Sequence, residues 1–374
     1  MTEVESSRGP GPDPTTVGVV WRVEPFLHVE DARIYNPLTD LSLAPPDPGY
    51  NELRALALGL TNTASLPTAL RSTLAARNWV VVDGPELASR FLLKYVSLEA
   101  HSVCNQGCYF CPVSIERRED HFMSMELYDA IARQLGELRE TIEGVSMINY
   151  NEPTVDKRFL EQVAVLKQYG LPAAVLTNGT GLTPKRVDAI VEMGGLVYLS
   201  VNLSTLDRER YAADREGDHL ELVLSNLDYM KRFPLAETME IVVLGVGDQT
   251  HVEDFGKISQ RFAHSRFEVK FYEVMNRSGN VPLGLRPAKR IDKLCGCEQT
   301  GSRPLQWLHI TPRGECVICC QDYHEHYVVG DLTKQSLLEV LTGPEIAKLR
   351  RWTYGIEEAP DDFICRDCIY ARTR

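Results

Sequence analysis

The spacing of hydrophobic residues changes along the chain and divides it into parts with different expected structures. In residues 17–90 the apolar runs are short, which predicts small strands around two helices. We expect strands at Val19–Arg22, Phe26–Val29, Ala32–Tyr35 and Trp79–Val82. The helices carry Leu53, Leu56 and Leu60, and then Leu66, Leu70 and Leu74 behind an N-cap at Ser65. This order predicts a winged-helix-like module.

Residues 91–286 repeat a different pattern, in which an apolar strand is followed by a loop and an amphipathic helix. Strands are expected at Leu92–Ala100, Gly144–Tyr150, Ala173–Thr177, Leu196–Leu203, Met239–Val246 and Glu268–Met275. Helices are expected to start at Ser124, at Thr183 with Pro184, at Asp218 and at a capping box from Thr250 to Glu253. Six repeats predict an α/β fold with a parallel sheet, either a partial (β/α)6 TIM-like barrel or a doubly wound sheet. Functional residues should lie at the carboxyl ends of its strands.

The repeat ends in residues 287–374, where seven of the ten cysteines fall between positions 295 and 368. Short segments with few apolar residues need another source of stability, so a small metal-stapled domain is expected there. At the other end, residues 1–16 are rich in Ser, Gly and Pro, which predicts a disordered tail.

Charge and hydropathy limit the classes of function. The net charge of −12 disfavours a protein that grips a nucleic-acid backbone. No apolar run approaches the roughly 18 residues of a membrane span, and the start of the chain does not resemble a secretory signal. We therefore expect a cytoplasmic protein without membrane or nucleic-acid partners. In a reducing compartment, clustered cysteines are more often metal ligands or catalytic groups than disulfides.

Three cysteines, Cys104, Cys108 and Cys111, share a short loop at the end of the first predicted strand of the repeat. Gly107 lets the backbone turn tightly between them. A structural zinc site or an ordinary iron–sulfur cluster takes four protein ligands, so three cysteines leave one position open for a substrate or cofactor. The alternative is a zinc knuckle in which His101 is the fourth ligand.

The spacing CxxxCxxC, with Phe110 before the last cysteine, resembles the radical S-adenosylmethionine (radical SAM) superfamily. The resemblance implies a [4Fe–4S] cluster on Cys104, Cys108 and Cys111 whose remaining iron binds SAM. It also implies reductive cleavage of SAM to a 5′-deoxyadenosyl radical, which abstracts hydrogen from a substrate. Such a radical needs a closed, dry site.

Further positions match those that bind SAM in this family. Asn151, Glu152 and Pro153 follow the second strand and resemble the GGEP motif, with Glu152 as the partner of the SAM ammonium. A surface turn is the alternative for this tripeptide. The other implied SAM contacts are Thr177, Asn178, Ser200, Asn202 and Gly245. Asn276 to Gly279 is similar to a turn that leads into the auxiliary domain of many members.

The second group of cysteines resembles the SPASM or shorter Twitch extension of these enzymes. The resemblance implies one auxiliary [4Fe–4S] cluster, whose ligands we expect to be Cys297, Cys319, Cys365 and Cys368. Cys295, Cys316 and Cys320 remain unassigned. A zinc ribbon with two CxxC pairs is the alternative. Asp322 and Tyr323 follow the cysteines and are weak catalytic candidates, with roles in turn formation and packing as the alternative.

The first part of the chain bears on the substrate. Residues 17–95 hold seven basic and eight acidic residues, whereas a DNA-reading winged helix should be basic. The outline resembles the PqqD-like module that binds a leader peptide as an added strand, and a domain that only covers the barrel is the alternative.

We therefore expect a peptide maturase supplied with electrons by flavodoxin or ferredoxin. The alternatives are a radical SAM dehydrogenase, epimerase or decarboxylase acting on a sugar or other small natural-product precursor, and, more remotely, a non-enzymatic zinc adaptor. No cysteine lies between Cys111 and Cys295, which disfavours an epimerase.

Overall fold

The structure is a computed structural model, and it describes residues 20–281 and 290–373. The predicted tail, residues 1–16, and the predicted boundary between residues 286 and 287 lie outside the described residues. Contacts within the chain divide it into two compact units. The first unit ends at Leu92, and the second begins at Leu93.

The N-terminal unit contains two small antiparallel sheets and two helices. Its elements are β1 (Trp21–Val23), β2 (His28–Val29), β3 (Ile34–Asn36), β4 (Leu41–Leu43), α1 (Tyr50–Ala57), η1 (Thr63–Ser65), α2 (Thr68–Ala76), β5 (Val80–Val82) and η2 (Pro85–Ser89). β1 pairs with β5, and β2, β3 and β4 form a three-stranded sheet in that order. Apolar residues of both helices and several strands, among them Ile34, Leu53 and Trp79, form one core.

Three details of this unit differ from the prediction. Strand β4 was not predicted, because it is only three residues long and a proline-rich loop follows it directly. Helix α1 ends at Ala57, so Leu60 lies beyond it and is 76% exposed. The N-cap of α2 is Pro67 instead of Ser65. The side chain of Asn62 instead accepts the N–H groups of Ala64 and Ser65 in η1.

The second unit is built on one nine-stranded sheet with the order β11-β10-β9-β8-β7-β6-β13-β14-β15. Its first six strands along the chain are β6 (Tyr95–Leu98), β7 (Gly144–Ser146), β8 (Ala173–Thr177), β9 (Leu196–Asn202), β10 (Ala236–Gly245) and β11 (Phe267–Glu273). Each pairs in parallel with the next. This confirms the predicted α/β fold with a parallel sheet. The order is open at both edges, as an incomplete barrel requires.

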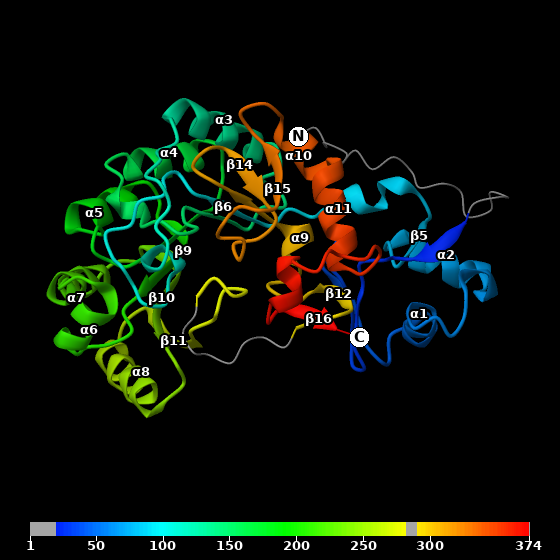
Figure 1. The fold of residues 1–374 in the computed structure, drawn as a ribbon, viewed down its shortest axis with the longest axis horizontal. Helices are drawn as coiled ribbons and strands as arrows, with labels where there is room; N and C mark the ends of the chain where they lie inside the picture. Colours follow the sequence, from blue (N-terminus) through cyan, green and yellow to red (C-terminus); the bar gives the residue numbers. More distant parts are fainter. Residues whose placement is uncertain (1–19, 282–289, 374) are drawn as a thin grey trace. The chain divides into compact units, whose positions relative to one another are not determined.

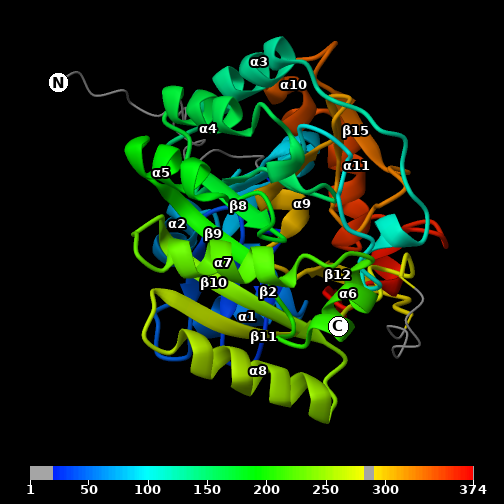
Figure 2. The same ribbon diagram turned by 90° about the vertical axis from the view of Figure 1, so that its left-hand side faces the viewer.

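Helices connect these strands and cover one face of the sheet (Figures 1 and 2). They are α3 (Met125–Gly136), α4 (Phe159–Gln168), α5 (Pro184–Glu192), α6 (Arg208–Arg215), α7 (Leu220–Met230) and α8 (Gln249–Phe262). The predicted starts at Ser124 and Thr183 are confirmed. The predicted starts at Asp218 and Thr250 were wrong. His219 is the N-cap of α7, and the Asp248 side chain caps α8 by accepting the His251 N–H.

Alternating residues of the strands give the sheet one apolar and one more polar face. Leu199 and Val201 of β9 are fully buried on the helix-covered face. Tyr198 and Ser200 alternate with them along β9 and therefore lie on the opposite face of the sheet. Ser200 is in register with Glu240 of β10.

The C-terminal segment extends the same sheet, which the sequence did not predict. Its elements are β12 (Leu294–Cys297), α9 (Arg303–Gln306), β13 (Trp307–Ile310), β14 (Glu315–Val317), β15 (Val328–Asp331), α10 (Leu337–Thr342), α11 (Pro344–Thr353), η5 (Ile364–Asp367) and β16 (Ala371–Thr373). β13 pairs in parallel with β6, and β14 and β15 follow antiparallel. β12 and β16, which border Cys297 and Cys368, form a separate two-stranded sheet.

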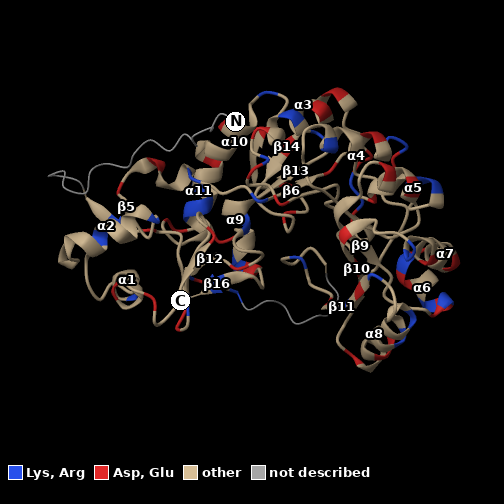
Figure 3. Cartoon of the chain, turned by 180° about the vertical axis from the view of Figure 1, so that it is seen from behind, with Lys and Arg blue, Asp and Glu red and all other residues tan. Residues whose placement is uncertain are grey.

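Basic and acidic residues are interspersed along the outer helices of this unit (Figure 3). Within the described ranges, none of the helices has the length and apolar composition that crossing a membrane requires.

Candidate active site: two groups of cysteines and the residues between them

The loop that carries Cys104, Cys108 and Cys111 leaves β6 and is held by backbone contacts. The N–H of Cys111 donates to the Cys108 carbonyl at 2.9 Å. The Gly107 N–H donates to the Arg215 carbonyl at 3.0 Å, at the end of α6. A side chain at position 107 would lie 2.3 Å from a Glu216 carboxylate oxygen, so the glycine allows the close approach of loop and helix.

Arg215 is a buried residue of this site that the sequence did not reveal. Its guanidinium donates to the Gln106 side chain at 3.2 Å and to the Cys108 sulfur at 3.8 Å. It also donates to Asn202 and to the Leu203 carbonyl at the end of β9. Burial raises the pKa of Cys108, and Arg215 opposes that rise. Arg215 therefore links the cysteine loop to β9 and stabilises a thiolate.

The three thiols can act as metal ligands once they lose their protons. Burial raises the pKa of Cys104 to about 12 and that of Cys111 to about 11, so ligation must displace their protons. Around one tetrahedral zinc, sulfur atoms lie about 3.8 Å apart, because each Zn–S bond is about 2.3 Å. Within the described residues, no three cysteine, histidine or carboxylate side chains converge closely enough to hold one metal ion.

The Glu152 carboxylate is buried beside this loop. It accepts hydrogen bonds from the Thr154 hydroxyl at 2.5 Å and the Thr177 hydroxyl at 2.7 Å. Its second oxygen accepts the Asn178 N–H at 2.7 Å. The Asn178 amide donates to Asn105 of the cysteine loop at 2.8 Å. The fold thus brings together Glu152, Thr177 and Asn178, and the second oxygen of Glu152 keeps capacity for another donor.

The other predicted SAM contacts have varied surroundings. Asn151 donates to the Met147 carbonyl and accepts the Asn149 N–H, so it shapes the turn before Pro153. Ser200 is buried at the carboxyl half of β9, and the Phe110 ring lies 5.6 Å from the Arg215 guanidinium. A side chain at Gly245 would lie 2.5 Å from the His251 ring. Their contacts with SAM stay predictions.

Five cysteines of the second group lie in one neighbourhood. Antiparallel pairing of β12 with β16 places Cys297 opposite Ala371, three residues after Cys368. Burial raises the pKa of Cys365, and the neighbouring Cys368 and Cys297 raise it further. A hydrogen bond with Cys320 raises the pKa of Cys319, which also neighbours Cys297. The proposed ligand set Cys297, Cys319, Cys365 and Cys368 is compatible with this arrangement, and Cys320 lies beside it.

Cys316 is separate from this neighbourhood. It is fully buried in β14, opposite Ile310 of β13, and burial is the first cause that raises its pKa. We assign it to the apolar core. Cys295 lies on β12 and is partly buried.

Asp322 and Tyr323, the weak catalytic candidates, both have intramolecular partners. The Asp322 carboxylate accepts the N–H groups of His326 at 3.0 Å and Tyr327 at 2.7 Å, which closes its own loop. The Tyr323 hydroxyl donates to the carbonyl of Glu116. These contacts favour the alternative of turn formation and packing.

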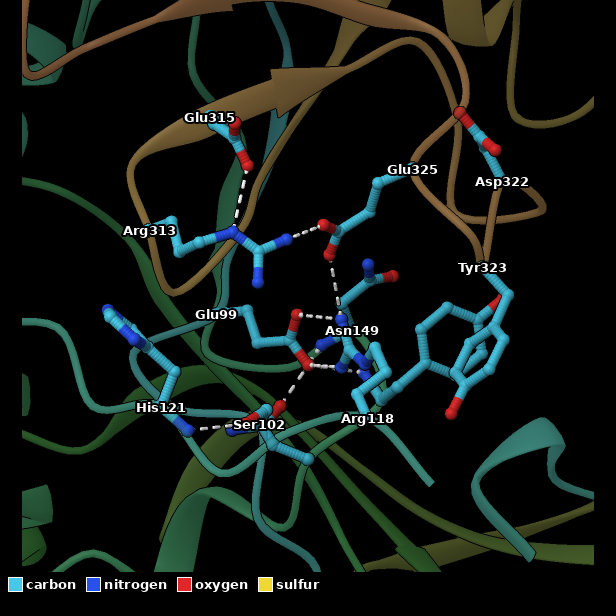
Figure 4. Close-up of polar contacts among 12 residues, drawn as sticks. Glu99, Ser102, Arg118, His121, Asn149, Arg313, Glu315, Asp322, Tyr323 and Glu325 are labelled. Carbon is cyan, nitrogen blue, oxygen red and sulfur yellow. Dashed lines mark hydrogen bonds and ion pairs between the residues drawn. The ribbon is translucent and has the colours of Figure 1, made fainter. Parts of the chain in front are cut away.

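Arg118 is the centre of a buried ionic network between the two cysteine loops (Figure 4). It lies seven residues after Cys111. Its guanidinium donates to Glu99 at 2.5 and 3.1 Å and to Glu325 at 3.1 Å. The Glu99 side chain is fully buried at the end of β6. Burial raises the pKa of Glu99, and Arg118 opposes that rise.

Two tyrosines complete the connection. The Arg118 guanidinium lies 5.5 Å from the Tyr150 ring centre and 5.4 Å from that of Tyr323. The Tyr150 N–H donates to Glu99 at 2.9 Å, and its hydroxyl donates to the Cys320 carbonyl. Because Tyr150 stands two residues before Glu152, Arg118 joins the cysteine loop, the predicted SAM-binding turn and the auxiliary cysteine loop.

Comparison with known families identifies this arrangement. Residues 98–257 match the model of the radical SAM superfamily. The chain therefore carries a radical SAM domain, the class of domain that the parallel sheet and the three-cysteine loop define. Residues 297–369 match the SPASM model, an iron–sulfur cluster-binding domain, so its C-terminal part is a SPASM domain. The PqqD-like resemblance of the N-terminal unit stays a prediction.

Among curated relatives, the chain is 30% identical over 150 residues to the S-adenosyl-L-methionine-dependent 2-deoxy-scyllo-inosamine dehydrogenase of Niallia circulans, covering 36% of this chain and 59% of that protein. It is 33% identical over 115 residues to a tungsten-containing aldehyde ferredoxin oxidoreductase cofactor-modifying protein of Pyrococcus furiosus, covering 30% and 31%. The chain thus spans less than two thirds of these relatives' lengths.

Solved structures share the fold at low identity. SuiB of Streptococcus suis, bound to its precursor peptide SuiA, matches with a TM-score of 0.58 and 10% identity over 93% of both chains. The structure of anSMEcpe with bound AdoMet matches with a TM-score of 0.53 and 13% identity, covering 74% of this chain and 83% of that one.

The two domains imply the cofactors. The radical SAM domain implies SAM and a [4Fe–4S] cluster, and the SPASM domain implies auxiliary iron–sulfur binding. The residues present fit both: three partly buried thiols near the buried Glu152 carboxylate, and a second group of thiols at the β12–β16 pair. That there is a single auxiliary cluster stays a prediction.

Proposed function

We propose that the protein is a radical SAM enzyme that abstracts hydrogen from a ribosomally made peptide and completes a crosslink or an oxidation. When bound and reduced, the cluster and SAM supply a 5′-deoxyadenosyl radical. Breaking a substrate C–H bond leaves a substrate radical, which then loses one proton and one electron. The auxiliary cluster is the proposed acceptor of that electron, and flavodoxin or ferredoxin is the proposed reductant for the first cluster. A cytoplasmic location fits this chemistry.

The protein's own residues would hold SAM in a fixed place. Cys104, Cys108 and Cys111 would hold the cluster, and Arg215 would keep Cys108 as a thiolate. Glu152 would bind the SAM ammonium through the oxygen that carries only one hydrogen bond, while Thr177 and Asn178 fix the orientation of its carboxylate. Ser200 and Asn202 on β9 are the proposed partners of the SAM carboxylate and ribose.

The observation that carries the peptide proposal is the N-terminal unit. Its three-stranded sheet ends at β4, where Leu41 and Ser42 are exposed and β3 is the one strand partner among the described residues. Such an edge can accept a peptide as a further strand. The fold of SuiB, whose structure contains a precursor peptide, matches over 93% of this chain and therefore extends over this unit.

A second candidate is a radical SAM dehydrogenase acting on a small polyol or amino sugar. It is favoured by the 30% identity to the 2-deoxy-scyllo-inosamine dehydrogenase. In that case the N-terminal unit would have a role other than peptide binding.

The two candidates differ in what they predict for the β4 edge. The probe is the peptide encoded by any short open reading frame beside the gene, labelled with a fluorophore and titrated with the full chain. Leu41→Lys places a charge on the strand edge and should weaken binding about tenfold or more, equal to about 1.4 kcal/mol. The matched control is Leu58→Lys beyond α1, because Leu58 is 49% and Leu41 is 41% exposed. The control should change binding less than about twofold.

Equal binding by both variants would contradict the β4 edge as the peptide site. Absence of peptide binding by the unaltered chain, together with SAM-dependent oxidation of 2-deoxy-scyllo-inosamine, would replace the peptide proposal by the second candidate. Binding is measured by fluorescence anisotropy and oxidation by mass spectrometry of the product.

A further inference from the structure

A stack of three planar side chains lies on α9 and on one face of β13. The Arg303 guanidinium lies 4.4 Å from the centre of the Trp307 ring. The rings of Trp307 and His309 are nearly parallel, at 7°, with centres 5.7 Å apart. Because Trp307 and His309 alternate along the strand, both lie on the same face of it. His309 is fully buried.

The contact between Arg303 and His309 fixes the proton on the imidazole. Arg303 Nη1 lies 3.2 Å from His309 Nε2. A guanidinium can only donate, so Nε2 must be the acceptor and carries no proton. The ring is then neutral with its proton on Nδ1. Burial lowers the pKa of His309 to about 4, in agreement with this neutral form.

Each member of the stack has a buried nitrogen for which the described residues offer no hydrogen-bond partner. These atoms are Arg303 Nε, Trp307 Nε1 and His309 Nδ1. All three are N–H donors, since the tautomer of His309 places a proton on Nδ1. Buried donors in folded proteins are almost always paired. Three on one stack therefore indicate a group that accepts hydrogen bonds.

The charge of Arg303 points to the same kind of group. The backbone N–H of Arg303 donates a hydrogen bond to the Cys297 sulfur, which places Arg303 beside the auxiliary group of cysteines. No carboxylate of the described residues forms an ion pair with it. A partly buried cation without a carboxylate favours another negative partner. The thiols beside Arg303 are those of the auxiliary group.

We propose that Arg303, Trp307 and His309 form the hydrogen-bond donor wall of the auxiliary iron–sulfur cluster and raise its reduction potential. A cluster held by cysteine thiolates is anionic, and its sulfur atoms accept N–H bonds. One added electron makes the cluster more negative, so a cation and N–H donors favour the reduced form. The wall thereby suits the cluster to take an electron. This inference holds for any substrate and does not rest on the peptide proposal.

The test is the midpoint potential of the auxiliary cluster, followed by electron paramagnetic resonance during a redox titration of the reconstituted full chain. Replacing Cys104, Cys108 and Cys111 by Ala removes the signal of the first cluster, so that the signal of the auxiliary cluster is the one that remains. In this background Trp307→Phe removes one N–H and keeps an aromatic ring, and Arg303→Gln removes the charge. Both should shift the midpoint to lower potential, with the larger shift for Arg303→Gln. The matched control is Trp352→Phe, whose ring packs on Phe363 of the same domain, and it should cause no shift.

An unchanged midpoint in Trp307→Phe with full auxiliary iron content would overturn the proposal, even if Arg303→Gln failed to load a cluster. The proposal would also be overturned if Trp307→Phe weakened the binding of an acidic substrate without changing the midpoint potential. The donor wall would then face the substrate instead of the auxiliary cluster. No substrate or SAM is present in the titration, so its result is independent of the proposed function.

Discussion

Replacement of Cys104, Cys108 and Cys111 together by Ala is expected to abolish SAM cleavage and to leave the auxiliary cluster in place. The three thiols share one loop, which follows β6 and is hydrogen-bonded to the end of α6. The auxiliary group is held by the separate β12–β16 pair. Iron should fall from about eight to about four atoms per chain if each site holds four irons. The measurements are iron content after anaerobic reconstitution and 5′-deoxyadenosine release with dithionite.

Cys316→Ala is the matched control, because Cys316 is a fully buried cysteine of the same chain that packs in the core. It should keep the full iron content and the rate of SAM cleavage, at a stability cost of about 1 kcal/mol. Loss of all iron in the triple variant would mean that the two sites do not form independently. Continued SAM cleavage by that variant would remove these cysteines from the reaction.

Arg118→Gln is expected to destabilise the chain by about 3 kcal/mol or more and to weaken SAM binding. The change leaves the fully buried Glu99 carboxylate without its cation, and breaking a buried ion pair is costly for that reason. It also releases Tyr150, which holds the turn before Glu152. Arg118 is thus a positioning residue. The measurements are the chemical denaturation curve and the dissociation constant of SAM for the reconstituted chain.

Two further variants separate this effect from a general loss of charge. Arg117→Gln alters an exposed pair with Asp120 at 3.3 Å and should change neither measurement, because exposed pairs contribute little. Combining Arg118→Gln with Glu99→Gln removes the unpaired charge and should cost less than the sum of the single changes. Additive single effects, or unaltered SAM binding in Arg118→Gln, would show that the network does not couple the two loops.

The strands and several helices of the second unit could be read from the sequence because local patterns encode them. Strand β8 has the predicted bounds, Ala173–Thr177, since an apolar run flanked by a proline and a glycine turn leaves little ambiguity. The helix after Ser124 was also found, because its cap and its apolar spacing agree. The cysteine loop was recognisable for a similar reason: three ligands within eight residues form a local motif.

The residues between the two groups of cysteines could not be predicted, because their roles arise from distant contacts. Arg118 and Glu325 are 207 positions apart, and Arg215 and Cys108 are 107 apart. A single arginine in a helix or loop has no pattern that distinguishes it from a solvated one. The pairing of β13 with β6 was hidden likewise, since parallel pairing between distant strands leaves no local mark. These contacts nevertheless decide how the two sites are held together.

The central claim is that this chain uses one cluster to cleave SAM and carries a second. The most direct test is anaerobic reconstitution of the full chain with iron and sulfide, followed by metal analysis and by incubation with SAM and dithionite. We predict about eight irons per chain and equal amounts of methionine and 5′-deoxyadenosine. Zinc in place of iron, without iron-dependent formation of 5′-deoxyadenosine, would contradict the claim.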